Sequence, residues 1–333
     1  MRTFSLFFFI LVVPACLFSQ SSREKGLDYI TKKRAEAYVG FLAGDALEGR
    51  EAGKRGGLIA REYIQSILKD IGINPLSGSY LHPFEAYSKE RQTKTRYSVQ
   101  PDSVTKYKQE KAYRKLNLVN VLGCIEGKVK DEYVIIGAHY DHLGIDEALD
   151  GDKIYNGADD NASGVSAVLQ IAKAFAEIGE QPRRTIIFAF WDGEELGRLG
   201  SEYFISSFAD KPAIKGYINF DMIGRNNDES RPKQVVYFYS ETKPVFRAWL
   251  ESDITKYKLN LEPDYKSAKN SLGGSDNASF GKRGIPVIWY HTDGHPDYHQ
   301  PTDHTDKINW EKLVDITKAA YLNLWNMANL ETF

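Results

Sequence analysis

Apolar residues recur at helical spacing in two stretches near the start of the chain, residues 31–43 and 53–71. This spacing predicts an amphipathic helix in each stretch. The pattern breaks at residues 74–78, which contain Asn74-Pro75 and Ser77-Gly78, both typical of turns. Residues 82–111 are polar and rich in Tyr without a clear period, so they form either a loop or a pair of surface strands.

From residue 116 onward, continuous apolar runs alternate with amphipathic stretches. The runs predict buried strands and the amphipathic stretches predict helices. The predicted strands are residues 116–125, 133–139, 184–191, 216–221, 234–239 and 285–291, and the predicted helices are residues 163–178, 194–208, 243–258 and 310–330. Such alternation predicts an α/β fold, with a mixed, mostly parallel central sheet and helices on both faces.

The first nineteen residues differ from the rest of the chain. Arg2 is followed by an apolar run at residues 4–13 and by the small residues Ala15 and Ser19. The run is too short to span a bilayer comfortably and is typical of a secretory signal. We therefore expect residues 1–19 to be a signal peptide and the protein to be exported, periplasmic or extracellular, without stable membrane insertion after cleavage. A retained anchor and a lipoprotein at Cys16 are less favoured alternatives.

Composition and charge exclude some classes of function. The chain has 333 residues, of which 42% are hydrophobic and 13% aromatic, as in ordinary globular proteins. The formal net charge of −2 and the lack of a dense Lys/Arg run argue against a nucleic-acid partner. Loss of the signal would leave Cys124 as the one cysteine, so no intrachain disulfide is expected. Oligomeric state is not indicated.

Three predicted strands end in acidic residues or histidine. One runs into His139 and Asp141, the next into Glu194 and Glu195, and a third into Asp221. Ligands bind at the carboxyl ends of strands in open α/β sheets. A polar residue at a strand end often marks only the start of a loop, but three such ends together predict a site at one rim.

Two further segments carry candidate ligands. Asp159 and Asp160 lie in a Gly-flanked turn before a predicted helix, where either could simply cap the helix. Residues 291–304 contain four histidines whose spacing does not select a ligand.

Five motifs, read in chain order, carry a resemblance to a known family. They are His139-x-Asp141, Gly157-Ala-Asp-Asp160-Asn-Ala-Ser-Gly, Asp-Gly-Glu194-Glu195-Leu-Gly-x-x-Gly-Ser, Asn-Phe-Asp221-Met-Ile-Gly and Tyr298-His299-Gln-Pro-Thr-Asp303. This ordered set resembles peptidase family M28, zinc peptidases that include bacterial secreted aminopeptidases. The similarity runs from about Leu42 to near the C-terminus and includes Leu47-Glu-Gly-Arg50 and Gly273-Gly-Ser-Asp276.

The resemblance implies a zinc aminopeptidase (phosphorylase/hydrolase-like) fold and a centre with two Zn²⁺ ions per chain. Asp160 would bridge both ions, His139 and Asp221 would complete one site, and Glu195 and His299 the other. Imidazole nitrogen and carboxylate oxygen are ordinary zinc ligands, and paired ions need a shared anionic ligand. The resemblance also implies a cis peptide bond between Asp160 and Asn161. We expect residues 20–333 to form one domain, because the region beyond residue 115 makes one α/β unit on which the two N-terminal helices would pack. Residues 75–116 are too few for an inserted protease-associated domain.

Three further residues receive roles from the resemblance. Glu194 would be the general base acting on a zinc-bridging water. Asp141 would hydrogen-bond the far nitrogen of His139, and Tyr298 would stabilise the oxyanion. The remaining histidines of these segments are not expected to be ligands: His142, His291, His295 and His304.

An exopeptidase that releases N-terminal residues from peptides is therefore the leading hypothesis. A glutaminyl cyclase with one zinc is an alternative, because it shares the Asp-Gly-Glu-Glu run. A carboxypeptidase of the same family would need a basic cluster for the substrate carboxylate, and none stands out. A catalytically inactive binding protein is a fourth possibility, although all five candidate ligands are present. Residues 142–155 and 262–274 are expected to be pocket-wall loops, whose shapes would set substrate preference.

Overall fold

A nine-stranded sheet runs through the described chain in the order β1-β3-β5-β4-β6-β9-β7-β8, with β2 paired to β3. The computed structural model describes residues 20–89, 96–110, 113–208, 213–269 and 273–333, so the predicted signal peptide lies outside the described residues. The strands are β1 (Asn74–Pro75), β2 (Leu81–Lys89), β3 (Tyr113–Ile125), β4 (Val129–His139), β5 (Arg184–Trp191), β6 (Ala213–Phe220), β7 (Gln234–Ser240), β8 (Glu262–Ala268) and β9 (Val287–His291).

The centre of the sheet is parallel. Strands β5, β4, β6 and β9 pair in parallel, whereas β3 pairs antiparallel with β5 and β7 antiparallel with β9. The prediction of a mixed α/β sheet with a parallel centre is confirmed.

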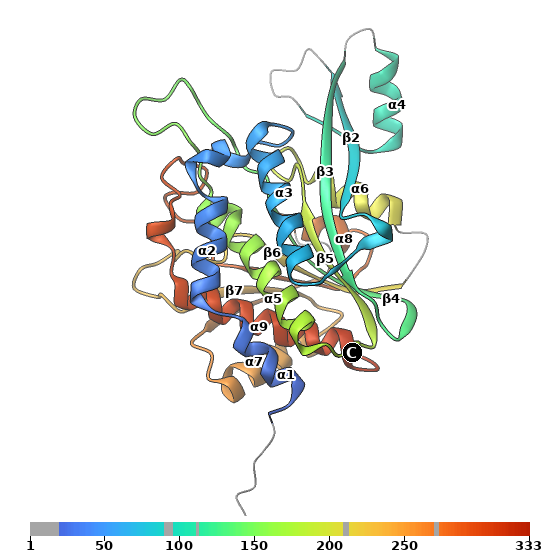
Figure 1. The fold of residues 1–333 in the computed structure, drawn as a ribbon, viewed down its shortest axis with the longest axis vertical. Helices are drawn as coiled ribbons and strands as arrows, with labels where there is room; N and C mark the ends of the chain where they lie inside the picture. Colours follow the sequence, from blue (N-terminus) through green and yellow to red (C-terminus); the bar gives the residue numbers. More distant parts are fainter. Residues whose placement is uncertain (1–19, 90–95, 111–112, 209–212, 270–272) are drawn as a thin grey trace, which may run out of the picture.

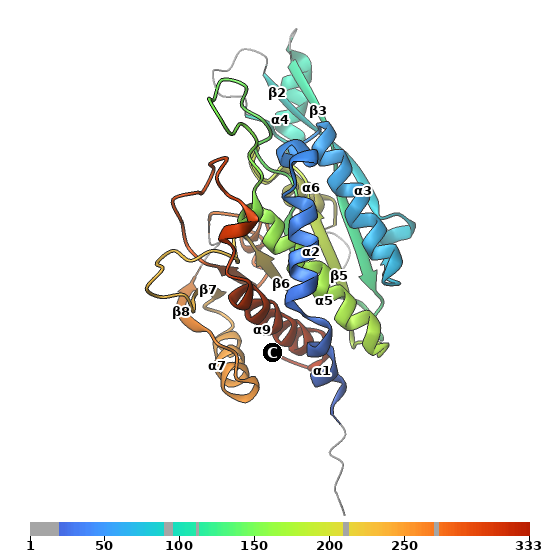
Figure 2. The same ribbon diagram turned by 60° about the vertical axis from the view of Figure 1, so that its left-hand side comes forward.

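Helices cover both faces of the sheet (Figures 1 and 2). On one face α3, α5 and α9 pack against the strands and α2 packs on α5 and α9, whereas on the other face α6 and α8 pack against the strands. The helices are α1 (Ser22–Lys25), α2 (Lys32–Leu42), α3 (Arg55–Asp70), α4 (Pro101–Gln109), α5 (Gly164–Ile178), α6 (Leu199–Phe208), α7 (Val245–Tyr257), α8 (Asn277–Gly281) and α9 (Trp310–Asn329).

The alternation of side chains along β4 explains these two layers. Val134 and Ile136 belong to the large core under α5 and α9, whereas Ile135 belongs to the smaller core on the opposite face, with Phe204 of α6. Successive side chains of a strand point to opposite faces, so a strand apolar at every position is buried on both. Burial on both faces explains why the sequence of β4 contains a continuous apolar run.

Helix ends follow local capping signals. The Thr31 side chain accepts a hydrogen bond from the Arg34 N–H at the start of α2, and Asn309 caps α9 in the same way through the Lys312 N–H. At the end of α5, Gly179 takes the left-handed conformation that glycine adopts without steric cost.

Residues 82–111, predicted as a loop or a strand pair, contain β2 and α4 in their described part. β2 pairs antiparallel with β3, from Leu81 opposite Val121 to Lys89 opposite Tyr113. Only the end of β3 pairs with β5, so β2, the start of β3 and α4 extend beyond the other strands (Figure 1).

Two predictions of secondary structure are wrong. The segment expected to be a loop at residues 262–274 contains β8, an edge strand parallel to β7. The helix expected from Glu194 begins at Leu199, and Glu194 and Glu195 lie in the preceding turn, where Gly193 and Gly197 have positive φ. Glycine takes such a conformation at low cost, which favours a turn at this point.

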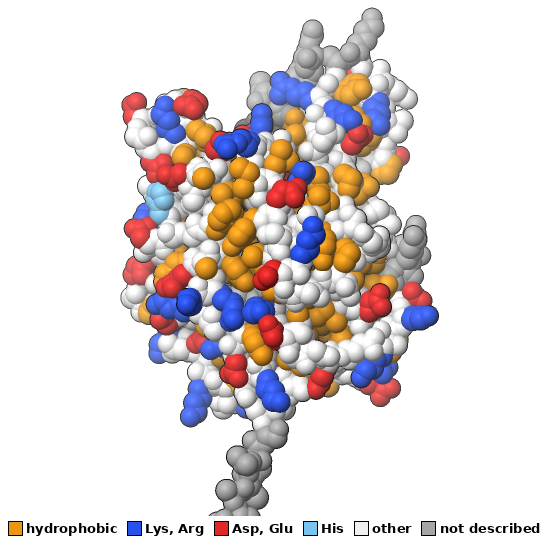
Figure 3. Space-filling model, viewed as in Figure 1, with side chains coloured by type: hydrophobic (Ala, Val, Ile, Leu, Met, Phe, Trp, Pro, Cys, Tyr) orange, Lys and Arg blue, Asp and Glu red, His pale blue; other side chains and the backbone are white. Residues whose placement is uncertain are grey.

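On the face drawn in Figure 3, Lys and Arg side chains are scattered among Asp and Glu rather than gathered in a basic stripe. No helix among the described residues combines the length and the apolar character needed to cross a lipid bilayer.

Candidate metal centre

The predicted rim exists, because three parallel strands end beside one another. β4 ends at His139, which lies opposite Trp191, the last residue of β5. β6 ends one residue before Asp221, and β5 ends three residues before Glu194. The parallel register therefore brings the histidine and the acids to the same edge of the sheet.

A cavity of about 250 Å³ opens at this rim. Five predicted metal ligands line it, together with Glu194 and Tyr298, whereas Asp141 does not. The lining residues are His139, Asp160, Glu194, Glu195, Asp221, Met222, Gly274, Trp289, His291, Tyr298 and His299.

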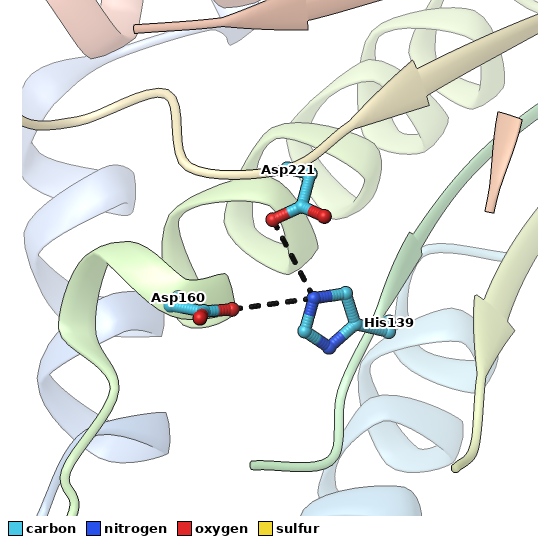
Figure 4. Close-up of side chains that lie close together, drawn as sticks. All are labelled: His139, Asp160 and Asp221. Atoms are coloured by element: carbon cyan, nitrogen blue, oxygen red, sulfur yellow. Dashed lines mark ion pairs between the residues drawn. The ribbon is translucent and has the colours of Figure 1, made fainter. Parts of the chain in front are cut away.

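The first half-site consists of His139, Asp160 and Asp221. The Nε2 atom of His139 lies 3.3 Å from Oδ1 of Asp160 and 3.6 Å from Oδ1 of Asp221 (Figure 4). All three residues are buried, and they form one of the two groups of described residues whose ligand atoms converge as a metal site requires.

The residues expected to hold the second ion, called the second half-site below, are Asp160, Glu195 and His299. The Nε2 atom of His299 lies 3.3 Å from Oδ2 of Asp160 and 3.2 Å from Oε2 of Glu195. Asp160 thus presents one oxygen to each half-site.

The distances between ligand atoms suit zinc. Two ligand atoms at zinc bond length and at a tetrahedral angle lie about 3.3 Å apart. The separations of 3.2 to 3.6 Å in both half-sites are close to this value. The donor set, imidazole nitrogen with carboxylate oxygen, is also the one that zinc takes.

The position of Asp160 is fixed by hydrogen bonds between the backbone around it and Asp303. The Asp303 carboxylate accepts hydrogen bonds from the N–H groups of Asp159 and Asp160, at 3.0 to 3.1 Å. The peptide bond between Asp160 and Asn161 is cis, as the resemblance implies. Burial disfavours the charged carboxylate of Asp160, but His142, His139 and His299 outweigh it and hold its pKa well below the ordinary value.

Arg50 connects the segment after His139 with the segment that ends at Asp160. It is 1% exposed, and its guanidinium donates to the carbonyl oxygens of Tyr140, Leu42, Asn156, Gly157 and Asp160. Burial lowers the pKa of Arg50 to about 10, although nearby carboxylates oppose this shift. Arg50 therefore stays charged at neutral pH and offsets part of the negative charge of the centre.

The Asp141 side chain does not make the hydrogen bond to His139 that was expected of it. Its carboxylate accepts the N–H groups of Glu194 at 3.0 Å and Glu195 at 3.3 Å. The Nδ1 atom of His139 lies 3.1 Å from the Asp141 carbonyl oxygen but 3.7 Å from the carboxylate. The backbone of Asp141 therefore orients His139. Its side chain holds the turn instead, because these two N–H groups precede the helix and have no partner within it.

Glu194 and Tyr298 face the cavity without belonging to either half-site. Burial raises the pKa of Glu194 well above its ordinary value, and His139 opposes this shift while the carboxylates of Asp276 and Asp221 add to it. Tyr298 is 45% exposed, and its ring stacks on His299 at 3.9 Å. Burial also raises the pKa of Tyr298, so its hydroxyl keeps its proton and can donate a hydrogen bond.

The sequence also did not predict the contact between His142 and Glu195. The Nδ1 atom of His142 lies 2.7 Å from Oε1 of Glu195. His142 and Glu195 are 53 positions apart, so no local pattern links them. The position of His142 directly after the His139-x-Asp141 motif is the one sequence feature that points to it.

The other three histidines of the motif segments that were expected not to be ligands have separate partners. His291 lines the cavity, with Nδ1 2.6 Å from the Asp221 carbonyl oxygen. His295 lies 3.2 Å from Asp159, and His304 lies 2.9 Å from Asp152. None of them belongs to a half-site as defined above.

Comparisons with known proteins agree with this geometry. A profile of peptidase family M28 matches residues 120–323, more than half of the chain. Leupeptin-inactivating enzyme 1 of Streptomyces exfoliatus is 37% identical over 133 residues, which are 39% of this chain and 28% of that enzyme. The match thus spans less than a third of that relative, and its full activity does not follow for this chain.

Solved structures share the fold at low identity. The LapA aminopeptidase of Legionella pneumophila has a TM-score of 0.68 at 20% identity, covering 99% of this chain and 81% of LapA. A glutaminyl cyclase of Fimbriiglobus ruber has a TM-score of 0.64 at 16% identity, covering 89% of this chain and 95% of the cyclase. Because both activities occur on this fold, the fold does not decide between them.

Proposed function

The chain belongs to peptidase family M28, and we propose that it is a two-zinc aminopeptidase that releases N-terminal residues from peptides. One observation carries the proposal. Asp160 places Oδ1 3.3 Å from His139 and Oδ2 3.3 Å from His299, as a carboxylate shared by two ions would. Both half-sites have three ligand groups, which leaves coordination positions for water and substrate.

The chain's own residues have separate tasks in this proposal. When held by the two half-sites, zinc ions would supply Lewis acidity and a water of lowered pKa. The Glu194 carboxylate accepts a proton from the attacking water and returns it to the leaving amine. Burial raises the pKa of Glu194, which makes its carboxylate a stronger proton acceptor. The Tyr298 hydroxyl donates to the developing oxyanion.

The charge of the cavity favours an aminopeptidase over a carboxypeptidase. Among the described residues that line it, none is Lys or Arg, whereas four are Asp or Glu. A free substrate carboxylate would therefore find no cationic side chain there, although a carboxypeptidase would need one to hold it. A glutaminyl cyclase would need one zinc, so the complete second half-site speaks against it. The presence of both half-sites equally disfavours an inactive binding protein.

We further propose that residues 1–19 direct export, and that residues 20–333 form one peptidase domain without a protease-associated insert. The apolar run at residues 4–13 supports the first proposal. The second is supported by the single sheet that includes every strand of the described residues.

The test compares Glu194→Ala with wild type and with the surface control Glu36→Ala, by zinc analysis and by hydrolysis of a leucine chromogenic amide. Wild type and control should bind two zinc ions per chain, and chelation should abolish hydrolysis until zinc is returned. Glu194→Ala should keep both ions and lose about 10²–10⁴-fold in kcat, because proton transfer loses its base. An active Glu194→Ala enzyme would reject the assigned base, and a wild type with one zinc would reject the two-metal centre.

A further inference from the structure

His142 is buried against the second half-site but is not one of the five predicted ligands. It is 2% exposed, and its Nδ1 atom lies 2.7 Å from Oε1 of Glu195. It also forms, with Asp160 and Glu195, the second group of described residues whose ligand atoms converge. The geometry must therefore distinguish a metal ligand from a residue that acts through Glu195.

The distances separate these two roles. Ligand atoms that share a tetrahedral zinc lie about 3.3 Å apart, whereas an N–H···O hydrogen bond to a carboxylate is about 2.7–2.9 Å long. The separation of 2.7 Å between His142 and Glu195 is that of a hydrogen bond, and the distance of 3.9 Å to Oδ2 of Asp160 is long for a shared ion. His299, at 3.3 and 3.2 Å from the same two residues, has the spacing of a ligand.

The two oxygens of Glu195 therefore have different partners. Oε1 faces His142 and Oε2 faces His299. Glu195 lies in a turn rather than in a helix, and its backbone is held by the Asp141 carboxylate. A hydrogen bond to Oε1 would fix the remaining side-chain torsions and aim Oε2 into the half-site.

The ring of His142 is itself fixed by close packing. A Cβ atom added at Gly157 would meet its Cδ2 atom at 2.6 Å, so the glycine leaves just enough room for the imidazole. Its backbone N–H donates to the Arg50 carbonyl oxygen at 3.1 Å, and its ring lies edge-on to His299. A fixed donor of this kind costs little entropy when it orients a ligand.

We infer that His142 is a positioning residue of the second half-site, which donates from Nδ1 to Oε1 of Glu195 and thereby reserves Oε2 for the metal. The inference rests on the proposed two-metal function. It predicts a selective effect, because the first half-site, formed by His139, Asp160 and Asp221, contains no atom of Glu195. Loss of His142 should weaken the second zinc and leave the first unchanged.

The experiment compares three substitutions at His142 in the full chain. His142→Ala and His142→Leu remove the donor, and the second keeps most of the volume in case the first fails to fold. His142→Asn keeps an N–H donor at nearly the same place, since Nδ2 of Asn and Nδ1 of His are both attached to Cγ. The partly exposed His304, which belongs to neither half-site, gives the matched control His304→Ala. Stepwise zinc affinities are measured by competition with a chromophoric chelator, and cobalt(II) spectra report the ligand set.

The donor-less variants should bind the second zinc about 10–100-fold more weakly, as is usual when a partner that orients a ligand is lost. His142→Asn should recover most of that loss with an unchanged cobalt spectrum. Unchanged second-site affinity in the folded donor-less variants would overturn the inference. So would failure of His142→Asn to restore affinity together with an altered cobalt spectrum, because His142 would then be a ligand. A wild type that binds one zinc would instead reject the proposed function.

Discussion

The two half-sites share Asp160 but are built in different ways. In the first, His139 is the last residue of β4 and Asp221 directly follows β6, so both are placed by the sheet. In the second, Glu195 lies in a turn and His299 in the segment after β9, with its side chain 35% exposed against 1% for His139. Sheet ends fix ligands directly, whereas ligands on turns and loops require additional contacts.

Those additional contacts are present around the second half-site. The Asp141 carboxylate holds the turn that carries Glu195, and His142 contacts the Glu195 side chain. The segment that carries His299 is contacted by Asp159, whose Oδ2 atom lies 3.2 Å from Nε2 of His295. The Oδ1 atom of Asp159 accepts the Gly224 N–H at 2.6 Å. We infer that the second half-site depends more on its surroundings and is the easier one to disrupt.

The largest effect is expected from Asp160→Ala, which removes the residue that both half-sites share. The variant should retain no zinc at concentrations that saturate wild type, and hydrolysis should fall to background. Its melting temperature should no longer rise when zinc is added, because metal binding is coupled to folding stability. Zinc analysis and thermal melts with and without zinc test this. Retention of one ion would mean that one half-site is independent of Asp160 and that the two do not share a ligand.

The difference between the half-sites also decides what the sequence could predict. Strand periodicity placed His139, Glu195 and Asp221 at one rim, because parallel strands end together. Periodicity could not select His299 among the four histidines of residues 291–304, and its assignment came from the resemblance alone. Its place beside Asp160 depends on a loop whose course no local pattern encodes.

The failure of local patterns to encode tertiary surroundings also explains the two wrong predictions of secondary structure. β8 has the sequence Glu-Pro-Asp-Tyr-Lys-Ser-Ala, which lacks the apolar alternation of a strand because it lies at an edge of the sheet and none of its residues is buried. α6 begins at Leu199 rather than Glu194, because the Asp141 carboxylate and two positive-φ glycines stabilise a turn. The contact between His142 and Glu195 likewise arises from tertiary packing and not from sequence spacing.

A smaller and selective effect is expected from a pair of ligand variants, His139→Ala and His299→Ala. Each should lower the zinc content from two ions to one at moderate zinc concentration. The affected affinity should fall more than about 100-fold, since loss of a mere orienting partner already costs about 10–100-fold. Stepwise titration should show that His299→Ala keeps the tighter ion and His139→Ala the weaker. If His299→Ala keeps the weaker ion, the proposed ranking of the half-sites is reversed.

The smallest effect is expected at Asp303, which contacts no predicted ligand atom and acts through the backbone of the shared ligand Asp160. Its Oδ2 atom accepts both the Asp159 and the Asp160 N–H at 3.0 Å, and its Oδ1 atom accepts only the Asp159 N–H, at 3.1 Å. Asp303→Ala removes all of these acceptors and should weaken both zinc ions by about 10–100-fold. Asp303→Asn can keep its amide oxygen at the Oδ2 position and should lose much less. Because Asp160 belongs to both half-sites, the ratio of the two affinities in Asp303→Ala should equal that of wild type, whereas in His142→Ala it should change. Stepwise chelator titration of the three proteins measures this ratio, and a selective loss of one ion in Asp303→Ala would show that Asp303 serves a single half-site.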